Sequence, residues 1–429
     1  MAEQKRDRGL RSLPTARVRH GKLRRSAWWS TALKVVGATM AIVLVSGASV
    51  AAIALNNLTS NIDIAQLTDA DGNVREIPQV GQWEGGFSVF IAGVDNAEGQ
   101  NDAGERDGVT LNDVNLLVHI AEDQQSAVAI SIPRDLVVPI PSCPDPDGDG
   151  ASSAMSAQPI NTAMSYGGLN CVVLTVEALT GLEIPYAATI SFDGVAQMST
   201  AVGGVDICIT EPINDRYTGL NLETAGIHTV EGYDALAFLR TRYGVGDGSD
   251  LSRISSQQVY LSSLMRKVQN EGVLTDPTAV YGIASVATQA MSLSPSLASP
   301  DTMVSMALAL RGIPTENITF VQYPATTGVG GVYAGKAAPV KDLADALFER
   351  IRNDESFLLA DDATGNGSTL DPSAPGAAPT EAPAATDPAA PVDPNAPPAP
   401  TASVAPEAPV LDGVLGQTAD QFTCSVANR

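Results

Sequence analysis

The chain has 429 residues and a formal net charge of −23, with 48 acidic and 25 basic residues. Ten of the basic residues lie in Met1–Lys34, so the rest of the chain carries 15 basic against 46 acidic residues, a net charge of −31. Such a body argues against a nucleic-acid partner, because nucleic-acid binding needs clustered cations that neutralise phosphates. The length suggests two or three folding units.

The first predicted element is a transmembrane helix. Val35–Leu55 contains 21 residues without a charge, about the length that a bilayer core requires, and Trp28 and Trp29 precede it as interfacial aromatics do. We therefore expect a basic cytoplasmic arm over 1–34 and a single-pass cell-membrane protein whose remaining chain is extracytoplasmic. A cleaved signal peptide is the alternative, but the long basic arm favours a retained anchor.

The four cysteines all follow this segment. Export favours disulfides, and four cysteines allow three pairings. Cys143 and Cys171 flank one loop and are the preferred pair. That pairing leaves Cys208 with Cys424, which would tie the end of the chain to the domain. Free thiols remain an alternative.

A β-hairpin is predicted over Asn112–Asp135. Val114–Ile120 and Ala127–Ile132 have the composition of strands and are joined by a polar turn. Because a hairpin brings its outer ends together, Asp113 and Arg134 are predicted to be neighbours. A carboxylate and a guanidinium at one end of a sheet suit a phosphate or metal–phosphate site. The alternative is a surface ion pair, which contributes about 0–1 kcal/mol.

Strands and helices alternate elsewhere, which predicts α/β layers around one sheet. Further strands are expected at Phe87–Ala92, Tyr186–Phe192, Val205–Ile209 and Ile318–Gln322. Helices are expected at Leu169–Gly181, Asp193–Val202, Glu231–Leu239, Leu251–Gln269, Thr275–Ala290, Pro300–Arg311 and Val340–Arg352, of which Leu251–Gln269 is long and amphipathic. Val137–Ala157 and Glu211–Thr229 are expected to be irregular.

These elements place a globular domain at 86–355, after the transmembrane helix at 35–55 and a polar connector at 56–85. From Asp361 to Asp412 the chain is rich in proline and alanine and has no lysine or arginine, a composition that cannot bury a core. We therefore expect a disordered linker over 356–412. The last segment, 413–429, is less biased and is a candidate to dock on the domain.

Arginines and aspartates are the residues that can carry chemistry here. The sequence has no zinc-type cysteine–histidine cluster, no P-loop and no G-x-S-x-G motif. Arg240 and Arg242 are two residues apart, and Arg253 and Gln257 share one face of a predicted helix. Guanidiniums that converge from separate elements suit a pyrophosphate. Solvent-facing ion pairs are the alternative for each of them.

Two aspartates are candidate ligands of a divalent metal ion. Asp95 follows the strand Phe87–Ala92, and Asp113 precedes the first strand of the hairpin. Mg²⁺ prefers a few carboxylates together with oxygens of the substrate, so two acids in strand-end loops suit it.

Five motifs follow one another along the chain. They are SIPRD at Ser131–Asp135, INTAMSYGG at Ile160–Gly168, FDGVAQMSTAVGGVDICI at Phe192–Ile209, GYDALAFLRTRY at Gly232–Tyr243 and SDLSRISSQQ at Ser249–Gln258. This ordered set resembles the LytR-CpsA-Psr family of membrane-anchored cell-wall ligases. The resemblance is clear over Phe87–Gln269 and extends weakly to about Arg352. It implies a three-layer α/β/α fold with a central mixed sheet and a long hydrophobic pocket for a polyprenyl chain.

The resemblance also implies a reaction. Members transfer a phospho-linked glycopolymer, arabinogalactan-like or teichoic-acid-like, from a polyprenyl-pyrophosphate carrier to peptidoglycan. The expected partners are therefore the carrier-linked glycan donor, the peptidoglycan acceptor and the cytoplasmic membrane. The expected cofactor is Mg²⁺ or Mn²⁺, and pyrophosphatase activity is an expected side reaction. The long spacer and the cysteine pattern look like those of actinobacterial relatives, which favours an arabinogalactan-type polymer.

The functional residues of the family map onto this sequence through the motifs. By this resemblance Asp95 and Asp113 are metal-binding acids, and Arg134 is the main catalytic arginine. Asp113 or Asp135 is expected to accept the proton of the acceptor hydroxyl. The pyrophosphate clamp corresponds to Arg240, Arg242, Arg253 and Gln257.

The sequence departs from the family pattern at several positions. Leu111 and Ala97 stand where members usually have arginine, and Pro159 stands where many have lysine. Arg106 is a candidate substitute in the pyrophosphate site. In some relatives the cysteine that corresponds to Cys208 pairs with a cysteine near position 225. This chain has Ala225 and no cysteine there, which favours Cys424 as the partner of Cys208.

Two other functions are compatible with the sequence. The missing arginines motivate a non-catalytic binder of prenyl-phosphate lipid or wall polymer. A DNA-binding regulator rests on the basic arm and on names often given to the family, and the acidic body and the membrane span disfavour it.

Overall fold

The computed structural model describes residues 62–75, 86–95, 110–145, 150–371 and 408–428, together with positions 29, 32–37 and 39–40. The chain divides into two units, Met1–Asn56 and Asn57–Arg429. The described positions of the first unit are helical. Position 38 and positions 41–55 of the expected transmembrane span lie outside the described residues. Among the helices that are described, none has the length and apolar character to cross a bilayer.

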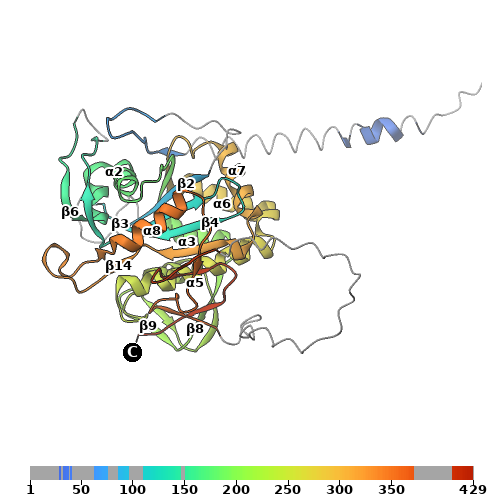
Figure 1. Ribbon diagram of the computed structural model, residues 1–429. Coiled ribbons are helices and arrows are strands. Elements are labelled where there is room, and N and C mark those ends of the chain that lie inside the picture. Colours follow the sequence, from blue (N-terminus) through green and yellow to red (C-terminus); the bar gives the residue numbers. More distant parts are fainter. Residues whose placement is uncertain are drawn as a thin grey trace, which may run out of the picture. The chain divides into compact units, whose positions relative to one another are not determined.

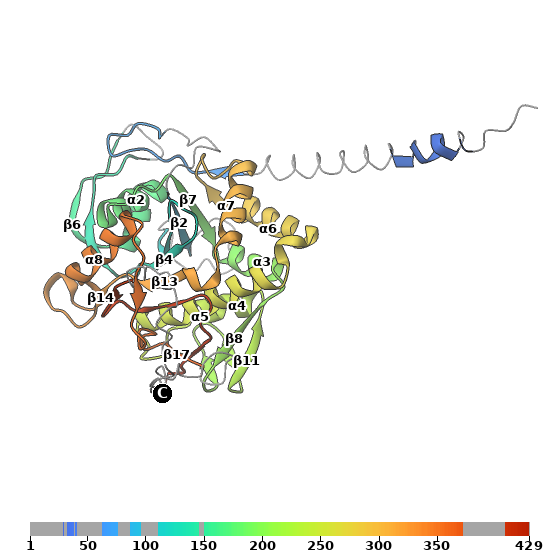
Figure 2. The same ribbon diagram turned by 45° about the vertical axis from the view of Figure 1, so that its right-hand side comes forward.

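An eight-stranded mixed sheet forms the centre of the second unit (Figures 1 and 2). Its strands, in spatial order, are β1 (Asp63–Ile64), β12 (Met291–Leu293), β7 (Tyr186–Ser191), β2 (Phe87–Val94), β3 (Asn112–Ile120), β4 (Ala127–Ser131), β13 (Ile318–Gln322) and β19 (Gly416–Thr418). The predicted hairpin is confirmed as β3 and β4, which pair in antiparallel fashion. β2 is parallel to β7, and β4 is parallel to β13.

Helices cover both faces of this sheet. They are α2 (Ala163–Thr180), α3 (Phe192–Ala201), α4 (Tyr233–Arg240), α5 (Asp250–Asn270), α6 (Pro277–Ala290), α7 (Pro300–Gly312) and α8 (Lys341–Arg352). Because side chains alternate along a strand, Phe90 and Leu117 pack with α2 and α8, whereas Phe87 and Phe320 pack with α5 and α7. The predicted α/β layering around a mixed sheet is therefore confirmed.

Helix α5 lies between the main sheet and a second, four-stranded sheet (Figures 1 and 2). The second sheet has the order β11 (Gly226–Val230), β8 (Val205–Ile209), β20 (Thr423–Ser425) and β17 (Ser368–Leu370). The polar side of the amphipathic helix α5 is therefore buried as well as its apolar side. Ser256 Oγ lies 2.6 Å from Ser425 Oγ, and Gln322 donates to Ser255 Oγ over 2.7 Å. Small hydroxyl side chains let two sheets approach one helix.

The two stretches expected to be irregular contain short strands. β5 (Val137–Ile140) pairs with β6 (Met155–Pro159), and β9 (Ile213–Asp215) pairs with β10 (Leu220–Leu222). Strands of three to five residues carry too little periodic pattern to be recognised, and pairing with a neighbour stabilises them. Two further pairs are β14 (Ala325–Thr326) with β15 (Ala338–Pro339), and β16 (Leu358–Leu359) with β18 (Val410–Leu411). The 3-10 turns are η1 (Ile160–Thr162), η2 (Val273–Thr275), η3 (Thr315–Asn317) and η4 (Gly331–Tyr333).

The sheets also take strands from outside the range 86–355. β1 of the connector pairs with β12, and Arg75 holds the connector by a two-pronged ion pair to Glu177 at 2.6 and 2.7 Å. Parts of the expected linker are ordered, since β17 pairs with β20 and a Cβ on Gly367 would lie 2.0 Å from Ser252 O. Residues 372–407 of that linker lie outside the described part of the chain. The last segment docks through β19 and β20.

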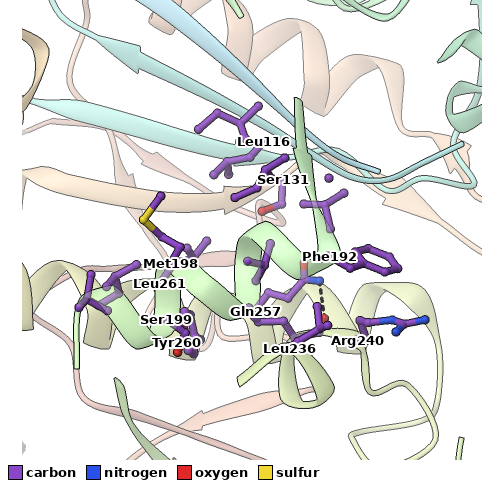
Figure 3. Close-up of a pocket in the computed structure, with 18 of the residues that line it drawn as sticks. Leu116, Ser131, Phe192, Met198, Ser199, Leu236, Arg240, Gln257, Tyr260 and Leu261 are labelled. Atoms are coloured by element: carbon purple, nitrogen blue, oxygen red, sulfur yellow. Dashed lines mark hydrogen bonds between the residues drawn. The ribbon is translucent and has the colours of Figure 1, made fainter. Parts of the chain in front are cut away.

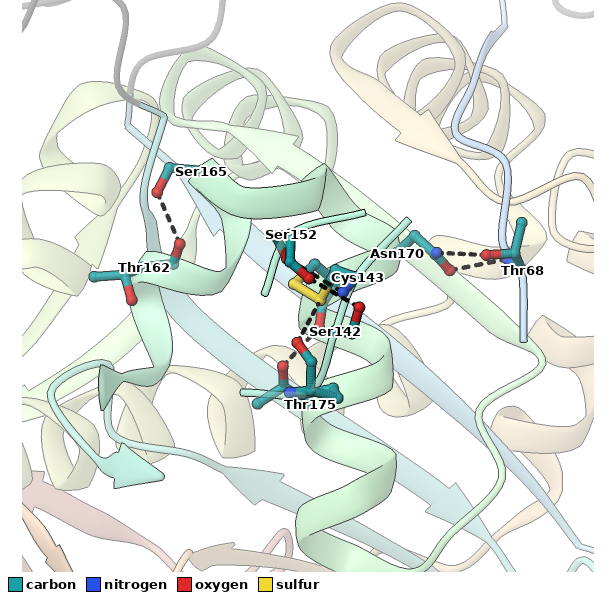
Figure 4. The surroundings of a disulfide bond; sticks show 10 residues. Thr68, Ser142, Cys143, Ser152, Thr162, Ser165, Asn170 and Thr175 are labelled. Atoms are coloured by element: carbon teal, nitrogen blue, oxygen red, sulfur yellow. Dashed lines mark hydrogen bonds between the residues drawn. A yellow bond between two sulfur atoms is a disulfide. The ribbon is translucent and has the colours of Figure 1, made fainter. Parts of the chain in front are cut away.

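Both preferred disulfides are present, Cys143–Cys171 and Cys208–Cys424. The first joins α2 to the loop after β5 (Figure 4). Helix α2 is kinked at Gly167, where a Cβ would lie 2.9–3.0 Å from the Cβ atoms of Cys143 and Cys171. The glycine pair of the INTAMSYGG motif therefore makes room for the disulfide. The second disulfide fixes β20 beside β8, which closes a loop over 216 positions of sequence.

Candidate active site

A β-bulge aims Asp113 into the site. Gly93 pairs with Val114 and Val94 pairs with Asn112, which leaves Asp113 as the extra residue of β3. A bulge of this kind redirects a side chain. Asp113 Oδ1 lies 2.5 Å from Arg134 Nη1. The prediction that the ends of the hairpin bring these two residues together is confirmed.

The loop that carries Arg134 is held by the second motif. Leu136 N donates to Pro133 O over 3.0 Å, which closes a turn around Arg134. The backbone of Asn161 then donates to Arg134 O over 3.1 Å, and that of Ile160 donates to Leu136 O over 2.9 Å. The Ile-Asn pair of INTAMSYGG therefore fixes the backbone from which Arg134 projects.

Asp250 joins two arginines at the start of α5. The helix is capped by Ser249, whose Oγ accepts from Ser252 N over 3.2 Å. Asp250 Oδ1 lies 2.7 Å from Arg253 Nη2 and 3.6 Å from Arg134 Nε. Arg253 Nη2 also donates to Asp113 O over 3.0 Å. We call Asp113, Arg134, Asp250 and Arg253 the charged cluster.

The cluster is buried enough that its charges depend on one another. Arg253 and Asp250 are 5% and 7% exposed. Burial lowers the pKa of Arg134, but the negative charges of Asp113 and Asp250 outweigh it, so that the pKa is raised overall. Burial also lowers the pKa of Arg253, and there it prevails over the attraction of Asp250 because the charge of Arg134 opposes protonation too. Guanidiniums stay protonated in proteins. The two arginines of the cluster are therefore cations, and their charge is balanced by the two aspartates.

Asp250 is a site residue that the sequence analysis missed. It occupies the first position of α5, within the SDLSRISSQQ motif. An aspartate in a first helical turn is usually explained by the helix dipole alone. The available signal was its spacing of three residues from Arg253, which places both on one face of a helix.

Asp95 and Asp113 lie at the same end of neighbouring strands. Asp95 directly follows β2, and its backbone N–H donates to Leu111 O over 3.4 Å. Asp113 contacts Arg134 through Oδ1, and a carboxylate has a second oxygen with which to accept a metal ion. Two acids from adjacent strand ends beside cationic phosphate donors fit the ligand preference of Mg²⁺.

The predicted clamp residues do not all join the charged cluster. Arg240, at the end of α4, stacks on Phe192 with 4.3 Å between Cζ and the ring centroid. Gln257 donates instead to Leu239 O over 2.8 Å (Figure 3). Arg242 follows α4, and its Nε is buried without a hydrogen-bond partner among the described residues.

Three more positions singled out in the sequence remain to be placed. Asp135 contacts Lys336, with 3.5 Å between Oδ1 and Nζ. Arg106 and Ala97 lie outside the described residues.

An apolar cavity of about 300 Å³ opens beside the cluster (Figure 3). Its apolar wall is formed by Ile91, Val114, Leu116, Ile190, Phe192, Val195, Met198, Val202, Leu236, Leu239, Tyr260, Leu261, Leu264 and Met291. Leu116 and Ser131 reach it from the sheet, whereas Met198 and Leu261 reach it from helices. Val114 and Ser131, which line the cavity, are close in sequence to Asp113 and Arg134, and the predicted clamp residues Arg240 and Gln257 line it as well.

His119 belongs to a buried polar contact rather than to a nucleophilic site. Its ring nitrogens lie 3.1 Å from Ser88 Oγ and 3.1 Å from Asp354 Oδ1. The three residue types could suggest a hydrolase triad. However, Ser88 is only 2% exposed and cannot reach a substrate. His119 is therefore a strand histidine whose two ring nitrogens both have partners.

Comparison with known proteins places these features in a family context. The sequence profile of the LytR_cpsA_psr family matches residues 46–349. The chain is 30% identical over 279 residues to the probable cell wall biosynthesis protein LcpB of Corynebacterium glutamicum, covering 62% of this chain and 61% of that protein. It is 27% identical over 229 residues to the cell wall biosynthesis protein LcpA of the same organism, covering 50% of this chain and 43% of LcpA. The matches thus span less than two thirds of either relative.

Two further proteins extend the comparison. The polyisoprenyl-teichoic acid–peptidoglycan teichoic acid transferase TagT of Bacillus subtilis is 29% identical over 261 residues, which cover 58% of this chain and 73% of TagT. A crystal structure of a Streptococcus agalactiae protein superposes with a TM-score of 0.51 at 21% identity, covering 62% of this chain and 87% of that one. The structural match supports a shared fold.

Proposed function

The chain belongs to the LytR-CpsA-Psr family, and we propose that it is a phosphotransferase that moves a phospho-linked glycopolymer from a polyprenyl-pyrophosphate carrier to peptidoglycan. The observation that carries the proposal is the junction of the charged cluster with the apolar cavity. A ligand with an anionic head and an apolar tail satisfies both at once. Relatives named for cell-wall biosynthesis and for teichoic acid transfer to peptidoglycan support this class of reaction.

The arginines act on the pyrophosphate. The prenyl chain enters the cavity, and Arg134 neutralises charge that develops on the transferred phosphorus. Arg240, Arg242 and Arg253 hold the leaving phosphate. Phosphoryl transfer of this kind needs mostly positioning and charge neutralisation. Asp250 serves as a positioning residue, because it contacts both Arg134 and Arg253.

The bond changes balance without any covalent enzyme intermediate. The acceptor hydroxyl oxygen forms a new bond to the glycan-bearing phosphorus. The bond from that phosphorus to the bridging oxygen breaks, and prenyl phosphate leaves with the electron pair. The hydroxyl proton passes to a carboxylate, either Asp113 or Asp135. Asp113 contacts Arg134, and Asp135 contacts Lys336.

Mg²⁺ or Mn²⁺ held by Asp95 and Asp113 would supply further neutralisation of the pyrophosphate oxygens. The remaining cationic charge comes from the chain itself. Leu111 brings no guanidinium to the site, and its carbonyl oxygen instead accepts from Asp95 N. We propose that Arg134 and Arg253 provide the phosphate contacts that an arginine at position 111 provides in relatives.

We also propose that the protein is anchored in the cell membrane with this domain outside the cell. Both disulfides support an extracytoplasmic location, because disulfides persist in oxidising compartments. The glycan is proposed to be arabinogalactan-like or teichoic-acid-like.

The test uses the full chain in detergent with a prenyl-pyrophosphate-linked saccharide. Release of prenyl monophosphate is followed by mass spectrometry, with and without peptidoglycan glycan strands. We expect release with Mg²⁺ or Mn²⁺, loss of release with a chelator, and glycan joined to the acceptor through a phosphodiester. Release to water without an acceptor would reveal the pyrophosphatase side reaction.

The same assay tests the competing function. Leu111, at a position where relatives have arginine, favours a non-catalytic binder of prenyl-phosphate lipid. Tight binding of the donor with no release of prenyl monophosphate would establish that function and overturn the phosphotransferase. An Asp95→Asn variant that keeps normal metal-dependent turnover would remove Asp95 from the metal site.

A further inference from the structure

Two exposed tyrosines form a rigid pair on the surface beside Arg242. Tyr217 lies in the turn between β9 and β10, and Tyr243 lies in the turn after α4. They are 65% and 61% exposed, and their ring centroids are 4.7 Å apart. The ring planes are inclined by 42°, and most of each residue is exposed to solvent. Single exposed aromatic residues are common on protein surfaces, but a paired and oriented set requires an explanation.

A buried carboxylate fixes the position of Tyr217. Asp215 is 2% exposed, and its Oδ1 accepts from Tyr217 N over 2.9 Å. Its Oδ2 accepts from Thr241 Oγ1 over 2.6 Å. Thr241 stands between the two predicted clamp arginines, Arg240 and Arg242. The turn that presents Tyr217 is therefore tied directly to the phosphate-binding segment.

The end of the chain fixes the position of Tyr243. Val245 N donates to Arg242 O over 3.3 Å, which closes a turn with Tyr243 at its second position. Asn428 Nδ2 donates to Tyr243 O over 3.1 Å, and Asn428 N donates to Gly244 O over 3.0 Å. The charge of Arg242 contributes to the lowered pKa of Arg253, so this turn lies within electrostatic reach of the charged cluster.

We propose that Tyr217 and Tyr243 form a sugar-binding platform that holds a glycan next to the phosphate site. The inference rests on the proposed function, since it names the part of the chain that meets the glycan. The C–H groups on one face of a sugar ring are weakly positive, and an aromatic face is negative, so the two attract each other. Asn214 and Asn221 lie on the same hairpin and can meet sugar hydroxyls.

A sugar suits this surface better than a protein partner does. A stable protein interface buries roughly 1,200–2,000 Å² in total, far more than two rings provide. Arg216 adds a cation to the platform, because its Cζ lies 4.8 Å from the Tyr217 ring centroid and its Nη2 donates to Tyr217 Oη over 2.8 Å. This cation suits a glycan that also carries phosphate.

Binding of uncharged oligosaccharides tests the platform. The full chain is titrated calorimetrically with a β-1,4-linked N-acetylglucosamine tetramer, which stands for the acceptor strand, and with a galactan tetramer, which stands for the polymer. We expect Y217A/Y243A to weaken binding of at least one probe about tenfold, on the scale of lost aromatic contacts. Y217F/Y243F, which keeps both rings, should bind within about twofold of the unchanged protein. Tyr281→Ala, an exposed tyrosine on α6, is the matched control.

The outcomes separate this inference from the proposed function, because binding is measured without turnover. The probe that loses affinity identifies the platform as a donor or an acceptor site. Equal affinity of the alanine pair, equal loss in the phenylalanine pair, or no binding of either probe by the unchanged protein would each overturn the platform. A chain that binds sugars through these rings but never releases prenyl phosphate would retain the platform and overturn the transferase.

Discussion

The charged cluster and the apolar cavity adjoin each other but are stabilised in opposite ways. In the cluster each buried charge has an opposite charge close by, such as Asp250 at 2.7 Å from Arg253. Removal of one member leaves the others without compensation. The cavity is different: it is about 300 Å³ of space bounded mostly by apolar side chains, with Arg240 and Gln257 among its few polar ones. The cluster therefore suits an anionic part of a ligand, whereas the cavity suits an apolar part.

Arg134→Ala should show the largest effect of any change in the cluster. We expect release of prenyl monophosphate to fall by about 10³–10⁵-fold, on the scale of an arginine that stabilises a phosphoryl-transfer transition state. Arg350→Ala is the control, because Arg350 contacts Glu355 and lies outside the five motifs. This change should leave the rate unchanged. A rate within tenfold of the unchanged protein would contradict the role of Arg134.

Asp250→Asn should destabilise the fold by about 3–5 kcal/mol, because it leaves the buried Arg253 without its carboxylate partner. The measurement is the free energy of unfolding in guanidinium chloride. The double variant Asp250→Asn with Arg253→Met should recover stability relative to Asp250→Asn alone, since it removes one uncompensated cation. Glu355→Gln is the control in a more exposed ion pair. A double variant no more stable than the single one would show that charge compensation is not what holds the cluster.

Val195→Trp tests whether the cavity binds the prenyl chain independently of the charged cluster. Val195 lies in the cavity wall on α3, so an indole there should occupy space that a prenyl chain needs. We expect about tenfold weaker binding of a prenyl phosphate of twenty carbons, equivalent to about 1.4 kcal/mol. Binding of inorganic pyrophosphate to the cluster should be unchanged. Val304→Trp, at an exposed position of α7, serves as the control. Equal loss of both ligands would mean that the two regions do not bind separate parts of one molecule.

Lys336→Ala should have the smallest effect. Lys336 is 3.5 Å from Asp135, and its side chain is 40% exposed, so solvent screens the pair. We expect a change in unfolding free energy below about 1 kcal/mol, as for other exposed ion pairs. The same denaturation measurement on Asp250→Asn shows whether burial of an ion pair determines how much unfolding free energy its loss costs. A loss as large as that of Asp250→Asn would argue that Asp135 belongs to the charged cluster.

Residues close together in a local pattern were predicted well. Asp113 and Arg134 were placed together because a hairpin brings its own ends together, whatever the rest of the fold does. Helix α5 was placed within a residue at each end by its apolar spacing. Its environment was not predicted, because Ser256 is covered by Ser425, which lies 169 positions away in the sequence. Likewise Gln257 shares a helix face with Arg253 but donates to a carbonyl of α4.

The sequence by itself determined most local elements, the preference for pairing Cys143 with Cys171, and the hairpin that joins Asp113 to Arg134. These follow from side-chain periodicity, turn composition and loop closure, which act over short distances along the chain. Only the tertiary structure decided that Asp250 completes the cluster, that the cavity opens at Val114, and that β20 enters the second sheet. The physical reason is that burial, charge compensation and strand insertion depend on which distant segments meet, and local spacing does not contain that information.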